Sequence, residues 1–131
     1  MTKLSVCLLT FNRAGLISKT IDTILKQSYS NFELIINDNC SSDETQKICV
    51  EFEKCDNRIR YYRNDTNLGL TGNYQAAFER SSAEYVAFLH DSDLYHPDLL
   101  KEWLDALKRF PSAAFVFNSI EAIDFKDQHI R

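Results

Sequence analysis

Short apolar runs alternate along the chain with segments in which apolar residues recur every three to four positions. The runs are nearly continuous, which is typical of strands that are covered on both faces. Four of them span residues 4–9, 33–36, 59–62 and 85–89. A further apolar run predicts a last strand at residues 113–117. The pattern therefore predicts a sheet of short, buried strands.

The segments between these runs predict amphipathic helices. Apolar residues at helical spacing place the first helix at about residues 14–27. Ser41 and Glu44 form a capping-box signature at the start of the second helix. A short third helix is expected at residues 74–80, and Pro97 fits the first turn of a fourth. Strands that alternate with helices predict an α/β fold, Rossmann-like and three-layered, with a mostly parallel sheet between helices.

Length and composition favour one ordinary globular domain over residues 1–131. Hydrophobic residues make up 44% of the 131 positions and charged residues 26%. No run approaches the roughly 18 apolar residues that a membrane span needs. Residues 1–9 are too short and too lightly charged for a signal peptide. A cytoplasmic location is therefore expected.

The charge balance and the cysteines narrow the classes of function. The net charge is −4 and no cluster of Lys and Arg is present, so a nucleic-acid partner is not expected. An anionic ligand would need a metal ion or a helix N-terminus to bind it. The four cysteines lack CxxC spacing and a zinc-like histidine pattern, so reduced thiols are expected, with a Cys49–Cys55 disulfide as the alternative. The dinucleotide, P-loop and nucleophile-elbow fingerprints are absent.

Three polar loops follow predicted strands, at residues 10–13, 37–43 and 90–93. Ligands of open parallel sheets bind outside the carboxyl ends of the strands, so these loops are expected to converge on one rim. Asp91 and Asp93 carry oxygen ligands of the kind that Mg²⁺ or Mn²⁺ prefers when bridging to phosphates. The alternative is a solvated turn that caps the following helix.

Other side chains on this rim have both a binding and a structural interpretation. Asp38 could accept a hydrogen bond from a ring N–H or a ribose hydroxyl, or it could hold a cap or Asx-turn. Phe11 could stack on a planar base, although closing the core is the simpler interpretation. Arg13 could pair with a phosphate or with an acidic neighbour. His90 and His96 rank below the carboxylates as metal ligands.

Five segments in order resemble motifs of the inverting family 2 glycosyltransferases of the GT-A fold. Residues 4–13 are similar to the family's opening strand and its P-T-Y-N-R loop, and residues 27–33 to its Q-T-Y-x-N-F-E linker. Residues 37–43 resemble its V-D-D-G-S-x-D or S-D-N-C-S-T-D loop. Within a polar loop at residues 63–72, Asn67-Leu68-Gly69 resembles an N-x-G loop, and Asp91-Ser92-Asp93 resembles the DXD element. No single motif is specific, but five in this order and spacing are.

The resemblance implies a nucleotide-diphospho-sugar donor, with a UDP-sugar favoured, and a Mg²⁺ or Mn²⁺ ion. It implies transfer to a sugar, a lipid-linked sugar or a protein, in cell-surface polysaccharide or glycan synthesis. The full-length enzyme would work in the cytoplasm, with peripheral association at the inner face of the membrane. Carried over by position, the nucleotide-binding residues are Thr10, Phe11, Asn12, Arg13, Asp38, Asn67 and Asp91, and the metal ligands are Asp93 and Asp91.

Several positions depart from the family pattern. Leu9 replaces the usual Pro, and Phe11 replaces the usual Tyr, which removes a phenolic hydrogen bond. Asn39 stands where many members carry a second Asp. The acidic loop aligns in two ways one residue apart, so Asp91 and Asp93 can exchange roles.

The resemblance covers the donor-binding half of such an enzyme. The family's general base is expected downstream of Arg131, so no catalytic residue is assigned, and Glu121, Asp124 and Asp127 come too early for this role. The chain is accordingly expected to be a GT-A domain truncated after its nucleotide-binding half, before the acceptor portion. Two other functions stay open: a nucleotidyltransferase with the same acidic metal site, and a non-catalytic interaction module whose acidic loops are only caps.

Overall fold

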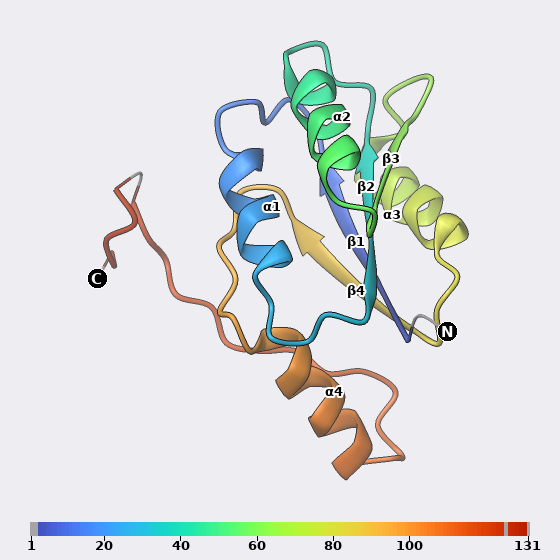
Figure 1. Cartoon of the computed structure of the whole chain (residues 1–131), viewed down its shortest axis with the longest axis vertical. Helices are drawn as coiled ribbons and strands as arrows, with labels where there is room; N and C mark the ends of the chain where they lie inside the picture. Colours follow the sequence, from blue (N-terminus) through green and yellow to red (C-terminus); the bar gives the residue numbers. More distant parts are fainter. Residues whose placement is uncertain (1–2, 125, 131) are drawn as a thin grey trace.

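A four-stranded parallel sheet organises the chain (Figure 1). The structure is a computed structural model that describes residues 3–124 and 126–130. The strands are β1 (Leu4–Thr10), β2 (Phe32–Asp38), β3 (Ile59–Arg63) and β4 (Tyr85–His90). They lie in the order β3-β2-β1-β4. The α/β class and the parallel sheet expected from the sequence are confirmed.

Helices cover both faces of this sheet (Figure 1). They are α1 (Ile17–Leu25), α2 (Thr45–Cys55), α3 (Gly69–Arg80) and α4 (Leu99–Arg109). Successive side chains of a strand point to opposite faces. In β1, Val6 and Leu8 accordingly pack in one core with α1, α2 and α4, whereas Cys7 and Leu9 pack in a second core with Ala77 of α3. Burial on both faces explains why the strands are nearly continuous apolar runs.

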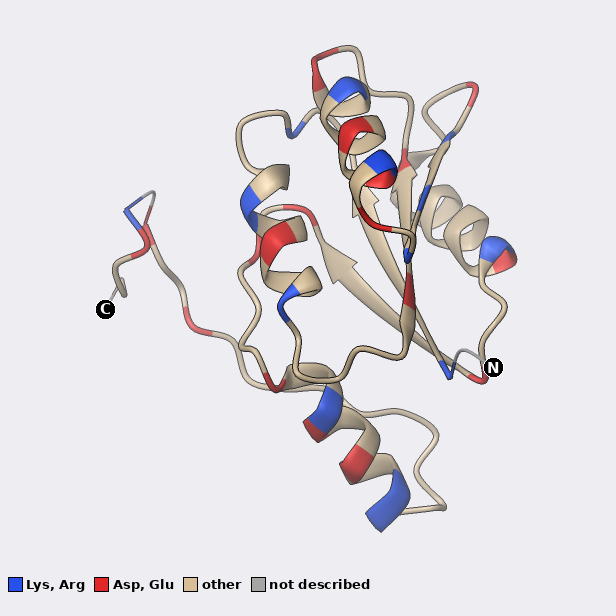
Figure 2. Ribbon diagram, viewed as in Figure 1, with Lys and Arg blue, Asp and Glu red and all other residues tan. Residues whose placement is uncertain are grey.

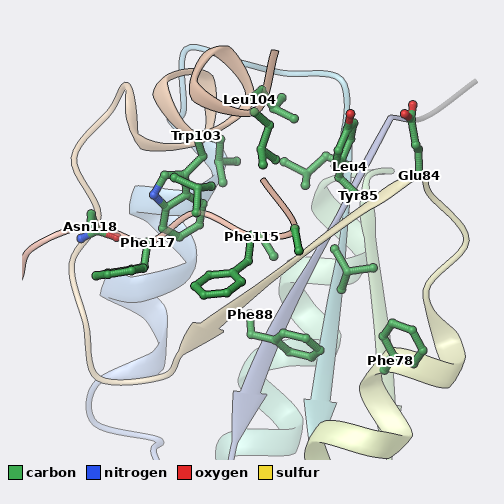
Figure 3. Close-up of a pocket in the computed structure, with 16 residues that line it drawn as sticks. Leu4, Phe78, Glu84, Tyr85, Phe88, Trp103, Leu104, Phe115, Phe117 and Asn118 are labelled. Carbon is green, nitrogen blue, oxygen red and sulfur yellow. The ribbon is translucent and has the colours of Figure 1, made fainter. Parts of the chain in front are cut away.

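The last predicted strand, at residues 113–117, is wrong. This segment has no strand structure, and the side chains of Phe115 and Phe117 are 74% and 80% exposed. Its apolar sequence suits a strand, but within the described residues no strand pairs with it. Together with α4 and the edge strand β4, the segment instead lines an apolar hollow of about 570 Å³ (Figure 3).

All four predicted helices form, but each begins at a different residue than expected. α1 begins at Ile17 because residues before it form a turn, in which the Leu16 N–H donates to the Arg13 carbonyl oxygen at 2.9 Å. α3 begins at Gly69, inside the segment expected as a loop, and α4 begins at Leu99, after Pro97. None of the helices described is both long enough and apolar enough to cross a bilayer.

The capping box predicted for the second helix does not form. Glu44 occupies the N-cap position of α2 and makes no side-chain capping bond. The Ser41 hydroxyl is used elsewhere, since it donates to Asp38 Oδ1 at 2.5 Å. Asp43 supplies the local acceptor instead, taking the N–H of Thr45 on Oδ1 at 3.0 Å. The first turn of α2 is therefore tied to the polar loop that precedes it.

The four cysteines are free thiols, as expected for a reduced protein. Cys7 and Cys49 are buried in the two cores, and this burial raises the pKa of each thiol to about 12. Both therefore behave as small protonated core residues. The alternative disulfide between Cys49 and Cys55 is absent.

Candidate functional site

The loops that follow β1 and β4 meet the segment that leads into α3 around one cavity. This cavity has a volume of about 380 Å³ and lies at the carboxyl ends of β1, β2 and β4. It is lined by Leu9, Thr10, Phe11, Arg13, Asn39, Asn67, Gly69, Leu70, Asn73, His90 and Asp91. Five of the eight residues assigned to the nucleotide or the metal are thus brought together: Thr10, Phe11, Arg13, Asn67 and Asp91. Asn12, Asp38 and Asp93 are not among the lining residues.

Thr10, the last residue of β1, carries a buried hydroxyl without a partner. The residue is 2% exposed, and in the described part of the chain its Oγ1 makes no hydrogen bond. A buried polar atom left unpaired costs about 1–3 kcal/mol. Thr10 lines the cavity, but its Oγ1 is itself buried, so its side chain would have to rotate for a ligand bound there to supply the missing partner.

Phe11 lies on the cavity rim rather than in the core. Its side chain is 40% exposed, so the simpler interpretation of the sequence, that it closes the core, is wrong. The reason lies in its backbone, because the Phe11 N–H donates to Asp91 Oδ2 at 3.1 Å across the site. This contact holds the residue after β1 beside the loop after β4. The ring remains available as a flat apolar surface.

Asp91 and Arg13 join the loops after β1 and β4. The Arg13 Nε lies 3.5 Å from Asp91 Oδ1 and donates to Ser92 Oγ at 3.2 Å. Of the two interpretations of Arg13, the structure therefore shows pairing with an acidic neighbour. Along the rest of the described ribbon, Lys and Arg positions lie among Asp and Glu positions (Figure 2).

The acidic loop is anchored from behind by α1. The Thr20 hydroxyl lies within hydrogen-bonding distance of two carbonyl oxygens, at 3.1 Å from that of Asp91 and 2.9 Å from that of Asp93. The Tyr95 hydroxyl donates to the His90 carbonyl oxygen at 3.0 Å, and burial raises the pKa of Tyr95 above its ordinary value. Asp93 itself is exposed. The loop thus presents its carboxylates from a fixed backbone.

The donor set around this loop suits a hard divalent cation only in part. Among the residues described, no group of three or more His, Cys, Asp or Glu could hold a metal. Asp91 and Asp93 offer carboxylate oxygens, and Mg²⁺ commonly takes one or two carboxylates and completes its shell with phosphate and water oxygens. The residues present fit a cation that is shared with a phosphate ligand. They do not form a closed metal site.

Asp38 is enclosed by the protein. It is fully buried, and its Oδ1 accepts hydrogen bonds from the Ser41 N–H at 2.9 Å and from the Ser41 hydroxyl. Its Oδ2 accepts a hydrogen bond from the Tyr61 hydroxyl at 2.6 Å. Burial and this bond to Asp38 raise the pKa of Tyr61. Asp38 therefore holds the turn that follows β2, and a contact with a nucleotide stays a prediction.

Asn12 connects the loops after β1 and β2. Its backbone has a φ of 51°, in the left-handed region that Asn tolerates better than most residues. Its N–H donates to Ser41 Oγ at 2.9 Å, and its Oδ1 accepts the Ser42 N–H at 2.8 Å. Both contacts position loops rather than face the cavity.

Sequence reasoning missed a group of buried asparagines beside the cavity. Asn37, Asn39, Asn64 and Asn73 are all at most 5% exposed. The Nδ2 of Asn64 donates to Asn73 Oδ1 at 3.0 Å and to Asn39 Oδ1 at 3.1 Å, and the Nδ2 of Asn37 donates to Asn73 Oδ1 at 2.6 Å. Arg80 of α3 donates to the side chains of Asn37 and Asn64. The available signal was the clustering of Asn at the ends of two neighbouring strands.

Comparisons with known proteins identify the family of this chain. The family model described as glycosyl transferase family 2 matches residues 5–129. The chain belongs to glycosyl transferase family 2. This family is the one whose motifs the sequence resembles.

Two curated relatives of this family are glucosyltransferases. The chain is 39% identical over 94 residues to the GalNAc(5)-diNAcBac-PP-undecaprenol beta-1,3-glucosyltransferase of Campylobacter jejuni, covering 71% of this chain and 30% of that protein. It is 29% identical over 120 residues to the UDP-Glc:alpha-D-GlcNAc-diphosphoundecaprenol beta-1,3-glucosyltransferase WfgD of Escherichia coli, covering 92% of this chain and 46% of that protein. The chain therefore spans less than half the length of either relative.

Solved structures of glycosyltransferases share the fold. S. aureus TarS, solved in complex with UDP-GlcNAc, matches with a TM-score of 0.74 at 24% identity, covering 82% of this chain and 31% of that chain. The mannosyltransferase PcManGT of Pyrobaculum calidifontis, solved with GDP-Man and Mn²⁺, matches with a TM-score of 0.76 at 21% identity, covering 80% and 32%. Both likenesses show the GT-A type of α/β fold for this chain.

Proposed function

We propose that this chain forms the nucleotide-sugar-binding part of an inverting glycosyltransferase. The observation that carries the proposal is the cavity in which Thr10, Phe11 and Asp91 meet at the carboxyl ends of the strands, in a chain of this family. The reaction is transfer of a sugar from a nucleotide-diphospho-sugar to an acceptor hydroxyl. The residues of this chain bind the donor as a single domain.

The names of the two relatives support a UDP-sugar donor and a lipid-linked acceptor. The Escherichia coli relative is named for UDP-Glc, and both names include a diphosphate-linked undecaprenol. An acceptor of this kind is held in a membrane by its polyprenyl chain. We therefore place the reaction in cell-surface polysaccharide or glycan synthesis, at the cytoplasmic face of the membrane.

Three residues of the cavity suit the nucleoside. The exposed ring of Phe11 offers a flat apolar face on which a base stacks. On rotation of its side chain, the unpartnered hydroxyl of Thr10 can donate to, or accept from, a polar atom of the base. Asp91 accepts hydrogen bonds from ribose hydroxyls beside its contact with Phe11.

The diphosphate needs positive charge that the cavity itself scarcely supplies. Among the described lining residues, Arg13 is the one Lys or Arg, and it already lies beside Asp91. We propose that Asp91 and Asp93 hold Mg²⁺ or Mn²⁺ together with the diphosphate. When bound, such a cation neutralises negative charge on the departing diphosphate. No general base for the acceptor hydroxyl is assigned within the chain.

The proposal is tested by titrating the protein with UDP in the presence of Mn²⁺ or of EDTA, by calorimetry. Mn²⁺-dependent binding is expected, and Asp93→Ala is expected to weaken it roughly tenfold or more. Asp105→Ala is the matched control, because Asp105 is an exposed α4 carboxylate paired with Lys108 on the surface. Equal affinity for UDP with and without Mn²⁺, or equal effects of the two variants, contradicts the proposal.

A further inference from the structure

The side chain of Asn39 borders the nucleotide cavity but has no hydrogen-bonding capacity left for a ligand. Its Nδ2 donates to Asn67 Oδ1 at 2.8 Å and to the Gly69 carbonyl oxygen at 3.2 Å. Its Oδ1 accepts from Asn64 Nδ2 at 3.1 Å and from the Leu68 N–H at 2.9 Å. A side-chain amide has two N–H donors and an oxygen with two lone pairs. All four positions of Asn39 are therefore used inside the protein.

All four partners of Asn39 belong to one segment, residues 64–69, which runs from the end of β3 into α3. Two of its members, Asn67 and Gly69, also line the cavity. The Asn39 N–H donates to the Thr10 carbonyl oxygen at 2.9 Å, so its backbone is fixed to the end of β1. Asn39 is 5% exposed, which shields these bonds from water. One side chain thus joins the floor of the cavity to its rim.

The rim segment contains one residue in the left-handed region, and this residue takes part in the same set of hydrogen bonds. Gly69 has a φ of +70°, a conformation that glycine adopts without strain. Its N–H donates to Asn67 Oδ1 at 2.8 Å, the same oxygen that Asn39 binds. Asn67 itself is exposed, so Asn39 supplies the buried side of this arrangement.

We propose that Asn39 is a positioning residue, which holds residues 64–69 as one rim of the nucleotide cavity and does not bind the base itself. The inference rests on the proposed function, since it assigns a role within the same cavity. Recognition of the polar atoms of the base then falls to other lining groups. Among the described side chains of the cavity, the Thr10 hydroxyl is the buried group without a partner.

An aspartate at position 39 separates this role from direct recognition of the base. A carboxylate only accepts hydrogen bonds, so Asn39→Asp keeps its bonds from Asn64 and Leu68. It loses both donated bonds and places a negative oxygen against the acceptors of Asn67 and Gly69. If position 39 contacted the base, the same carboxylate would accept a ring N–H and would favour a base that carries one. A positioning residue instead loses affinity for every nucleotide alike.

The first experiment measures the rim without a ligand. Amide hydrogen exchange of residues 64–69 is expected to accelerate roughly tenfold in Asn39→Asp, because each hydrogen bond lost lowers the cost of local opening. Asn67→Ala removes the oxygen that accepts from both Asn39 Nδ2 and the Gly69 N–H, and it is expected to accelerate exchange in this segment as well. Asn31→Asp is the matched control, since Asn31 is exposed and precedes β2 at the other end of the strand. Unchanged exchange of the rim in both test variants overturns the proposal.

The second experiment compares nucleotides. Titration with UDP and with GDP, each with Mn²⁺, is expected to show Asn39→Asp roughly tenfold weaker for both, with an unchanged ratio of the two affinities. A variant that changes this ratio, or that binds both nucleotides as well as wild type, overturns the positioning role. Failure of the wild-type protein to bind either nucleotide would refute the proposed function instead, and the exchange experiment would still decide whether Asn39 holds the rim.

Discussion

Replacing Thr10 by valine removes one buried hydroxyl and keeps the branched shape of the side chain. Within the described residues that hydroxyl has no hydrogen-bond partner, and Thr10 is 2% exposed. An unpaired buried polar group costs about 1–3 kcal/mol. Thr10→Val is therefore expected to raise the free energy of unfolding of the ligand-free protein by about 1 kcal/mol. Most Thr→Val substitutions in a protein core have the opposite effect, because they remove a hydroxyl that is hydrogen-bonded.

The same substitution is expected to have the opposite effect on nucleotide binding. A neutral hydrogen bond contributes about 0.5–1.5 kcal/mol, so its loss weakens binding about two- to tenfold. Thr10→Ser is the matched control, because it retains the hydroxyl and removes only a methyl group. It is expected to keep the affinity for UDP while losing some stability.

Urea denaturation of the ligand-free proteins and calorimetric titration with UDP and Mn²⁺ measure the two effects separately. The Thr10→Val protein is expected to be more stable than wild type and to bind UDP more weakly. A Thr10→Val protein that is less stable by 1 kcal/mol or more, in the way expected when a bonded hydroxyl is lost, would refute the statement that this hydroxyl is unpaired. An unchanged UDP affinity would refute its role in the cavity.

Two further substitutions test the polar contacts that hold the strands. Glu33→Gln is expected to lower stability by about 1 kcal/mol at neutral pH. Burial opposes ionisation of Glu33, but hydrogen bonds from Ser5 and Ser82 outweigh it and lower its pKa. The stabilisation by the Glu33 carboxylate is complete above its ordinary pKa of 4.5 and is lost as the pH falls through the lower pKa of the folded state. Urea denaturation curves of wild type and Glu33→Gln are therefore expected to converge in acid. A difference in stability between the two proteins that stays constant with pH contradicts the assignment. Tyr61→Phe leaves Asp38 Oδ2 without its donor and is expected to lower the free energy of unfolding, measured by urea denaturation, by about 1.5–3 kcal/mol. A decrease below about 0.5 kcal/mol contradicts the importance of this hydrogen bond.

Periodicity predicted the sheet well because a parallel sheet with two covered faces needs strands that are apolar throughout. The same reasoning failed at residues 113–117. An apolar run reports how well side chains suit a strand, but it does not report whether a neighbouring strand offers hydrogen bonds. Phe115 and Phe117 are exposed because no such neighbour is present among the described residues.

The position of the candidate site was predictable, but the hydrogen bonding of its members was not. Carboxyl ends of parallel strands meet at one edge, so the cavity beside Thr10 and Asp91 could be expected from strand order alone. Asp38 looked equally available in the sequence. Its oxygen is taken by Tyr61, which lies 23 positions further along the chain and approaches only when β3 pairs with β2. Such long-range contacts leave no local pattern.

The contact between the Phe11 N–H and Asp91 Oδ2 makes the two halves of the proposed donor site thermodynamically dependent on each other. A cation that binds the Asp91 carboxylate binds the same group that accepts the Phe11 N–H. That group orients the backbone of Phe11, whose ring stacks on the base. Under the proposed function, nucleoside and cation are therefore cooperative ligands. By linkage, the factor by which Mn²⁺ raises the affinity for a nucleotide equals the factor by which that nucleotide raises the affinity for Mn²⁺.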